Sequence, residues 1–269
     1  MNYPYRLLRL PAAVLLSFCW LLAGQHSWAD EAVSLVIIID DLGYSRRLGQ
    51  RAIELPGNIT YAVIPNSPNG KWLAQQAHEA GKEIMVHAPM SSIDGNSLEN
   101  GGLTTAMLPA EFLAAVQTGI QAVPHALGLN NHMGSELTQR PEYMRLLMQV
   151  VAKHNFYFID SRTSAQTIAA KMAERYRVRH LSRDVFLDNN QDYTATAAAF
   201  DQLLRIAKKK GVAVGIGHPY PSTLQFLEQA LPTLAERGVI LIPGSTAIDR
   251  YYRPSEQLAE RWGQLKPSK

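Results

Sequence analysis

Acidic residues and histidines recur in this sequence directly after short apolar runs. The pair Asp40-Asp41 follows Val-Ile-Ile-Ile, and His87, His132 and His218 each close or shortly follow another apolar run. Two or three histidines with a carboxylate are the ligands of catalytic zinc sites that keep one coordination position open. Such a site lowers the pKa of a bound water to about 7. Hydrolysis is therefore the reaction class that these residues predict.

Other polar residues have simpler interpretations. Asp and Asn after strands often serve only as turn formers or helix caps. That role explains Asn66, Asp188 and Asn189, and it is as plausible as a functional role for Asp160. The remaining histidines are interpreted as ordinary polar residues: His26, His78, His125, His154 and His180.

The first 29 residues have the pattern of a secretory signal. Arg6 and Arg9 precede an apolar run, Leu10–Gly24, and Ser27-Trp28-Ala29 offers small residues for cleavage after Ala29. The run is shorter than the ~20 apolar residues of a membrane span. We expect an exported protein with no stable membrane span after cleavage, periplasmic if the source is Gram-negative; a retained anchor is the alternative.

The cysteine count and the net charge exclude two kinds of site, a metal site with thiolate ligands and a nucleic-acid-binding surface. Cys19, inside the signal, is the one cysteine of the 269 residues, so a metal in the mature chain needs nitrogen and oxygen ligands. Without Arg6 and Arg9 the chain carries 24 basic and 23 acidic residues, a net charge of +1. Its one dense basic run, Lys208–Lys210, ends a predicted helix, where cations are favoured. No nucleic-acid partner is expected.

Short β-branched runs alternate with helical segments, which is typical of parallel βα units. The predicted strands are Val33–Ile39, Thr60–Ile64, Glu83–His87, Ala126–Asn130, Phe156–Ile159, Arg183–Leu187, Val212–Ile216 and Val239–Ile242. The predicted helices are Asn69–Ala80, Pro109–Ala122, Pro141–Lys153, Thr194–Lys210 and Ser222–Arg237.

These elements predict an α/β fold, a (β/α) barrel of seven or eight parallel strands, in some degree distorted, over residues 30–250. An open doubly wound sheet is the alternative. Residues 251–269 form a polar C-terminal tail, and Ala88–Leu108 a long loop of the kind that is usually functional. Because the C-terminal ends of parallel barrel strands meet on one rim, the polar clusters are expected to converge there.

Taken in order, five motifs resemble the divergent polysaccharide deacetylase family, a branch of the carbohydrate deacetylases with a NodB-like (β/α) barrel. They are Ile39-Asp40-Asp41-Leu42-Gly43, His87-Ala88-Pro89-Met90, Asn130 to Ser135, Asp160-Ser161-Arg162-Thr163 and Gly217-His218-Pro219. The likeness covers about residues 33–245.

The resemblance implies a role for each matching residue. Asp40 would be the general base and Asp41 a metal ligand, most simply of zinc. His87 matches the first of two ligand histidines four residues apart, but the second position holds Ser91. This departure puts metal binding in doubt, and His132 is the expected replacement.

The resemblance also supplies the acid and the substrate. His218 matches the histidine that protonates the leaving amine, and Asp160 matches the position of a carboxylate that orients such a histidine. The implied reaction is attack of a metal-activated water on an acetamide carbonyl of an N-acetylated envelope polysaccharide.

Two other functions fit the same residues. Because Ser91 replaces a ligand, the barrel could be a catalytically inactive scaffold that binds glycans or a protein partner. A different barrel metallohydrolase, acting on amides or esters of small molecules, would share the ligand set and differ in substrate.

Overall fold

The computed structural model of the protein describes residues 33–254. Its strands are β1 (Val33–Leu42), β2 (Thr60–Val63), β3 (Glu83–Met90), β4 (Ala126–Met133), β5 (Tyr157–Asp160), β6 (His180–Ser182), β7 (Val185–Phe186), β8 (Val212–Gly217) and β9 (Val239–Leu241). Its α-helices are α1 (Arg46–Ile53), α2 (Gly70–Glu79), α3 (Pro109–Ala122), α4 (Pro141–Lys153), α5 (Ala169–Arg175), α6 (Tyr193–Lys210), α7 (Pro221–Ala230) and α8 (Gly244–Tyr251).

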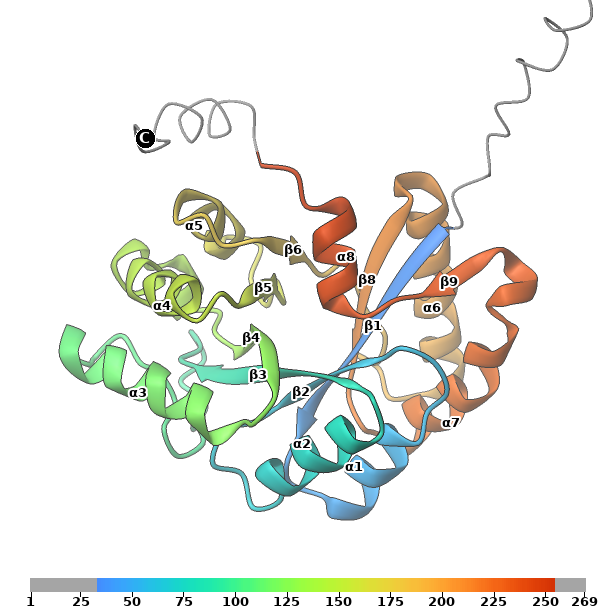
Figure 1. Ribbon diagram of the computed structural model, residues 1–269, viewed down its shortest axis with the longest axis horizontal. Helices are drawn as coiled ribbons and strands as arrows, with labels where there is room; N and C mark the ends of the chain where they lie inside the picture. The colour runs from blue at the N-terminus through green and yellow to red at the C-terminus, as the bar shows by residue number, and fades with distance from the viewer. Residues whose placement is uncertain (1–32, 255–269) are drawn as a thin grey trace, which may run out of the picture. The chain divides into compact units, whose positions relative to one another are not determined.

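The strands form one curved parallel sheet in the order β6-β5-β4-β3-β2-β1-β8-β7 (Figure 1). β1 pairs with β8 along one edge, and along the other it pairs first with β9 and then with β2. β1 to β6 follow one another in sequence order, so the sheet winds in one direction, as in a barrel and unlike a doubly wound sheet. The prediction of a distorted (β/α) barrel is confirmed.

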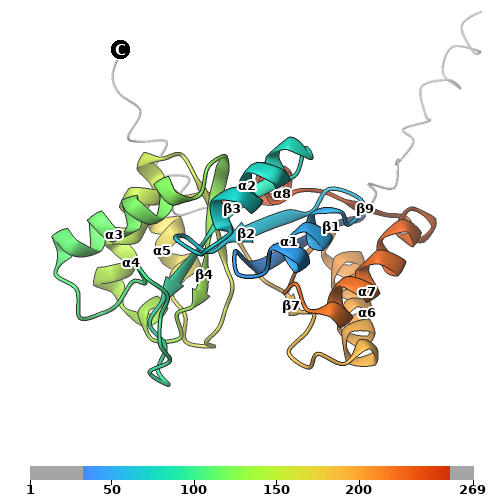
Figure 2. The same ribbon diagram turned by 90° about the horizontal axis from the view of Figure 1, so that it is seen from below.

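Alternation of side chains along the strands produces two apolar layers. Leu35, Ile37 and Ile39 of β1 belong to the outer layer, which packs against the surrounding helices. Val36 and Ile38 belong to the inner layer. Figure 1 shows α8 beside β1 and β8, and Figure 2 shows α3 to α5 on one side of the barrel and α6 and α7 on the other.

Helix α8 fills the barrel end opposite to the C-terminal ends of the strands. Ala247 and Ile248 of this helix are buried in the inner layer. The backbone N–H of Gly244 donates to Thr60 Oγ1 and that of Ser245 to Glu83, residues at the starts of β2 and β3. The polar rim therefore lies at the other end, where the predicted site residues follow their strands.

The structure adds elements that the sequence patterns do not predict, among them β6, α1, α5 and α8. It also shortens one helix: α7 ends at Ala230, and two 3₁₀ turns follow up to Arg237. Pro232 lies in the first of these turns, and a proline removes a backbone donor that a continuing α-helix would use.

Two predicted segments lie largely or wholly outside residues 33–254. The expected signal, residues 1–29, is not described, and of the expected tail the structure describes only residues 251–254, with Tyr251 still in α8. Among the described helices, none has both the length and the apolar character needed to cross a bilayer.

Candidate metal centre and active site

Three side chains from three strands meet at the C-terminal rim of the barrel. Asp41 comes from β1, His87 from β3 and His132 from β4, and each offers a ligand atom within 4.8 Å of the other two. Asp41 Oδ1 lies 3.1 Å from His87 Nε2 and 2.9 Å from His132 Nδ1. The two ring nitrogens are 3.1 Å apart. The sequence prediction that these residues converge is therefore met by the geometry.

The hydrogen bonds around this cluster are compatible with a bound cation. His87 Nδ1 lies 2.7 Å from the amide oxygen of Asn130, which can only accept, so in the neutral ring the proton belongs on Nδ1 and the Nε2 lone pair faces the cluster. Asp41 Oδ1 is buried and has no hydrogen bond of acceptable geometry. One carboxylate oxygen and two imidazole nitrogens are a zinc donor set with an open position.

A β-bulge brings both carboxylates of the aspartate pair to the site. Ile39 pairs with Tyr61 and Leu42 with Val63, so three steps along β1 oppose two along β2. The extra residue falls at Asp40-Asp41, and Asp41 has φ 57° in the left-handed region. Bulges turn a side chain away from its regular direction. Asp40 keeps the inward direction of Val36 and Ile38, and the bulge turns Asp41 toward the same rim.

Asp40 is almost fully buried, with 2% of its surface exposed. Asn130 Nδ2 donates to its Oδ1 over 2.8 Å, and its Oδ2 lies 3.5 Å from His87 Nε2. Burial raises the pKa of Asp40, although the charges of His87 and His218 oppose this. Burial would also raise the pKa of Asp41. The close nitrogens of His132 and His87 outweigh this effect and hold the pKa of Asp41 well below its usual range.

His218, which follows β8, is held by Asp188. Asp188 Oδ1 lies 2.8 Å from His218 Nδ1, and its Oδ2 accepts from the His218 backbone N–H and from Thr223 Oγ1. Burial alone would lower the pKa of His218, but Asp188 and the charges of Asp40 and Asp41 outweigh it and raise that pKa to about 9. Nε2 of His218 lies 3.9 Å from Asp41 Oδ2 and therefore faces the cluster of Asp41, His87 and His132.

Asp160 does not orient His218, which corrects the role implied for it by the resemblance. Tyr157 and Ile159 of β5 point into the barrel, so alternation sends Asp160 outward. There Asp160 accepts hydrogen bonds from the Arg162 backbone N–H at 2.9 Å and from Thr167 Oγ1 at 3.2 Å. Its carboxylate organises the turn after β5.

Three residues of the site were not predicted. Asn130 bridges Asp40 and His87, and Asp188, which the sequence favours as a turn residue, is the partner of His218. Both could have been found from alternation, because Asn130 lies two residues before His132 and Asp188 two residues after the inward-facing Phe186. Glu99 lies in the long loop, with Oε1 3.4 Å from His132 Nε2, and no periodic pattern points to it.

The remaining motif position, Ser91, directly follows β3. Its backbone N–H donates to Leu103 O over 2.9 Å, and its carbonyl accepts from Leu137 N. Its Oγ is buried without a hydrogen-bond partner among the described residues. Ser91 thus joins the long loop to the barrel, and a histidine comes instead from β4.

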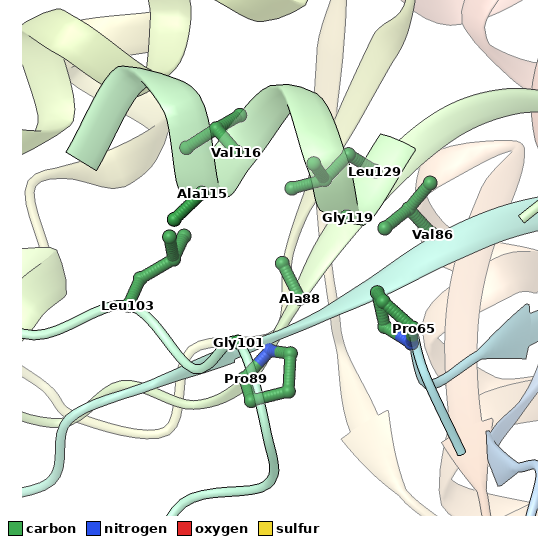
Figure 3. Close-up of a pocket in the computed structure, with 10 residues that line it drawn as sticks. All are labelled: Pro65, Val86, Ala88, Pro89, Gly101, Leu103, Ala115, Val116, Gly119 and Leu129. Atoms are coloured by element: carbon green, nitrogen blue, oxygen red, sulfur yellow. The ribbon is translucent and has the colours of Figure 1, made fainter. Parts of the chain in front are cut away.

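An apolar pocket near the same strands is separate from this site (Figure 3). Val86, Ala88 and Leu129 line it, together with Ala115 and Val116 of α3. Because His87 and Asn130 alternate with these residues, they point to the other side of the sheet. The pocket is part of the packing between sheet and helix, whereas the titratable side chains gather at the polar rim.

Four aromatic residues lie near the ends of predicted strands, Tyr44, Trp72, Tyr193 and Tyr220, and two of them lie at this rim. Tyr44 is 51% exposed, and the Tyr220 ring centroid is 5.4 Å from that of His218. Trp72 and Tyr193 pack elsewhere, against Arg46 and Phe226 respectively. Exposed aromatic faces at a site can stack on sugar rings.

Comparison with known proteins agrees with this architecture. The chain is 34% identical over 218 residues to the uncharacterized protein YibQ of Escherichia coli K12, covering 81% of this chain and 68% of that protein. It is 36% identical over 202 residues to an uncharacterized protein of Haemophilus influenzae, covering 75% and 72%. The crystal structure of ATU2773 from Agrobacterium tumefaciens C58 shares the fold, with a TM-score of 0.77, 20% identity and coverage of 80% and 89%.

The family model described as divergent polysaccharide deacetylase matches residues 37–248, a span that contains every residue of the site. The chain therefore belongs to the divergent polysaccharide deacetylase family.

Proposed function

We propose that the protein is an exported, metal-dependent hydrolase that removes acetyl groups from N-acetylated sugars of an envelope polysaccharide. The observation that carries this proposal is the convergence of Asp41, His87 and His132 beside a buried Asp40 and a carboxylate-bound His218. Family membership supports deacetylation as the reaction.

Asp41, His87 and His132 would hold the metal, and their nitrogen and oxygen donors favour zinc. A bound zinc ion supplies Lewis acidity, which lowers the pKa of a coordinated water and polarises the acetamide carbonyl.

Asp40 is placed to take the proton of the attacking water. Asn130 Nδ2 donates a hydrogen bond to Asp40 Oδ1, which helps to fix the orientation of the Asp40 carboxylate. Oδ2, which lies on the side of His87 Nε2, remains to accept the proton. A base held in one orientation next to the reacting water contributes about 10²- to 10⁴-fold to a rate.

His218 is placed to protonate the leaving nitrogen. Asp188 holds the Nδ1 proton, so Nε2 is the nitrogen that faces the cluster and exchanges a proton with substrate. As the C–N bond of the acetamide breaks, this proton passes to the amine, and acetate leaves with the water oxygen.

Export is supported by the pattern of residues 1–29, which would bring the enzyme to the envelope, and to the periplasm in a Gram-negative source. Sequencing the N-terminus of the protein recovered from the cell exterior or periplasm tests this part. Asp30 is the expected first residue, and a chain found in the cytoplasm with Met1 intact contradicts it.

Acetate release from N-acetylated glycans tests the activity. Zinc-loaded wild type is expected to release acetate, Asp40→Asn to keep zinc but lose about 10²- to 10⁴-fold in rate, and Asp41→Ala to lose zinc. Glu142→Gln, an exposed change on α4, is the control. No release above a zinc-free sample across several envelope glycans contradicts the proposal.

A catalytically inactive, glycan-binding scaffold is the second candidate, and Ser91 in the place of a ligand histidine favours it. The two functions differ in their dependence on Asp41. If the protein is a scaffold, the Asp41→Ala variant binds glycan as well as the wild type does. If it is the hydrolase, the same variant loses its metal and its turnover.

A further inference from the structure

We propose that Glu99 is a positioning residue for His132: its carboxylate holds the Nε2 proton of that ring and so presents Nδ1 to the metal. The inference rests on the proposed function, because it assigns a role within the same metal centre.

The two histidines of the cluster face it with different nitrogens. His87 uses Nε2, and the Asn130 oxygen lies at its Nδ1. His132 uses Nδ1, so its Nε2 must carry the ring proton if Nδ1 is to offer a lone pair. A histidine ligand needs an acceptor at its second nitrogen to fix this tautomer and the ring orientation.

Glu99 is placed to be that acceptor. Its Oε1 lies 3.4 Å from His132 Nε2, within ion-pair distance and at the nitrogen that does not face Asp41. The Glu99 side chain is only 20% exposed. Its second neighbour is Tyr44: burial, then the charge of Glu99 and a hydrogen bond to Glu99, raise the pKa of Tyr44 to about 12. The carboxylate therefore lies at the rim, next to both His132 and Tyr44.

The long loop fixes Glu99 in this place. The loop is joined to the end of β3 by two backbone hydrogen bonds, Leu103 N to Pro89 O at 2.8 Å and Ser91 N to Leu103 O at 2.9 Å. Next to the glutamate, Gly102 N donates to Glu99 O over 2.9 Å. Glu99 therefore reaches His132 from a segment that is pinned to the same strand as His87.

This arrangement gives the loop a specific task. The histidine that replaces the missing ligand comes from β4, and the loop that begins at Ser91 returns a carboxylate to support it.

Zinc affinity and the tautomer of His132 test the inference together. Affinity is measured by competition with a chelator on wild type, Glu99→Ala, Glu99→Gln and the control Asp94→Ala, an exposed change in the same loop. The tautomer is read from long-range ¹H–¹⁵N correlation spectra of the zinc-free proteins, with His132→Gln to assign the signal.

We expect Glu99→Ala to weaken zinc binding roughly 10- to 100-fold, and Asp94→Ala to leave it unchanged. Glu99→Gln keeps an acceptor oxygen without the charge, so its affinity should lie between wild type and Glu99→Ala. In wild type His132 should be protonated at Nε2, and in Glu99→Ala this preference should be lost.

The outcomes separate the inference from the proposed function. Stoichiometric zinc in wild type with equal affinity in Glu99→Ala overturns the role of Glu99 and leaves the hydrolase intact. Wild type that binds no zinc contradicts the hydrolase, and the spectra still decide on Glu99, because a His132 tautomer indifferent to Glu99→Ala overturns its role as well.

Discussion

At the scale of single residues, the pair of His218 and Asp188 divides two tasks between two side chains. The Asp188 side chain is fully buried, and both of its oxygens accept hydrogen bonds, from His218 and from Thr223. It therefore fixes where the imidazole lies and which nitrogen carries the proton. In the proposed reaction His218, which is 21% exposed, meets the substrate with Nε2.

Asp188→Asn tests this division of tasks. Asparagine keeps the shape but removes the charge that stabilises a protonated imidazole, and its amide can present a donor to Nδ1. We expect kcat to fall by about 10²- to 10⁴-fold, with a smaller change in KM. Steady-state kinetics of acetate release measure both constants.

Asp160→Asn is the matched change, because Asp160 is also a buried carboxylate after a strand. Its partners belong to the turn after β5, so this change should lower the free energy of unfolding by about 1 to 3 kcal/mol and spare kcat. If Asp160→Asn loses as much kcat as Asp188→Asn, the assignment of Asp188 as the partner of His218 is wrong.

At the scale of strands, alternation and one bulge decide which polar residues enter the site. Strand-end position, read from the sequence, predicted the convergence of Asp41, His87 and His132. It left the role of Asp160 open, and the resemblance assigned that residue the wrong role, because position along a strand says nothing about which face a residue occupies. Side chains alternate between the two faces along a strand. Ile159 points into the barrel, so the next residue, Asp160, points outward.

Other features were beyond sequence reasoning for physical reasons. Strand β6 has three residues, His180–Ser182, and too few apolar positions to show a period. Glu99 lies in a loop whose course depends on backbone hydrogen bonds to β3. The barrel itself was predictable, since eight of its strands are marked by short runs that are mostly apolar, such as Val33–Ile39.

The packing between neighbouring strands makes a stability prediction. A Cβ at Gly128 of β4 would lie 2.6 Å from the ring of Tyr157 on β5, which is fully buried and hydrogen-bonded to Glu83. Because the ring cannot move, Gly128→Ala should lower the free energy of unfolding by about 1 to 3 kcal/mol. Urea denaturation followed by circular dichroism measures this change.

Gly119 of α3 is the contrasting position. A Cβ there meets the Pro65 side chain at an ordinary 3.6 Å, beside the apolar pocket of Figure 3. Alanine is a better helix former than glycine, so Gly119→Ala should stabilise the protein by up to about 1 kcal/mol. Equal effects of the two substitutions would contradict the packing of β4 against Tyr157.

At the scale of the whole molecule, the barrel separates stability from chemistry. The cluster of Asp41, His87 and His132 lies at the C-terminal ends of the strands, and α8 closes the opposite end. In parallel barrels the first face carries activity and the second carries stability. The clearest polar feature of the second face is Glu83, whose Oε1 accepts from Thr60 Oγ1 at 2.9 Å, Tyr157 OH at 2.7 Å and Ser245 N at 3.1 Å.

Glu83→Gln should therefore destabilise the fold without affecting the site. In the wild type Thr60, Tyr157 and Ser245 donate to one carboxylate, and in the variant a single neutral oxygen replaces it. Hydrogen bonds to a charged group contribute about 1.5 to 3 kcal/mol each. It also removes a negative charge that lies beside the N-terminus of α8, where such a charge is favoured. We expect the free energy of unfolding to fall by about 1 to 3 kcal/mol, while zinc affinity and kcat below the unfolding transition stay at wild-type values.

The exposed Glu236→Gln controls for loss of a surface charge. A fall in zinc affinity with unchanged stability would mean that the two ends of the barrel are coupled, and the separation argued here would not hold.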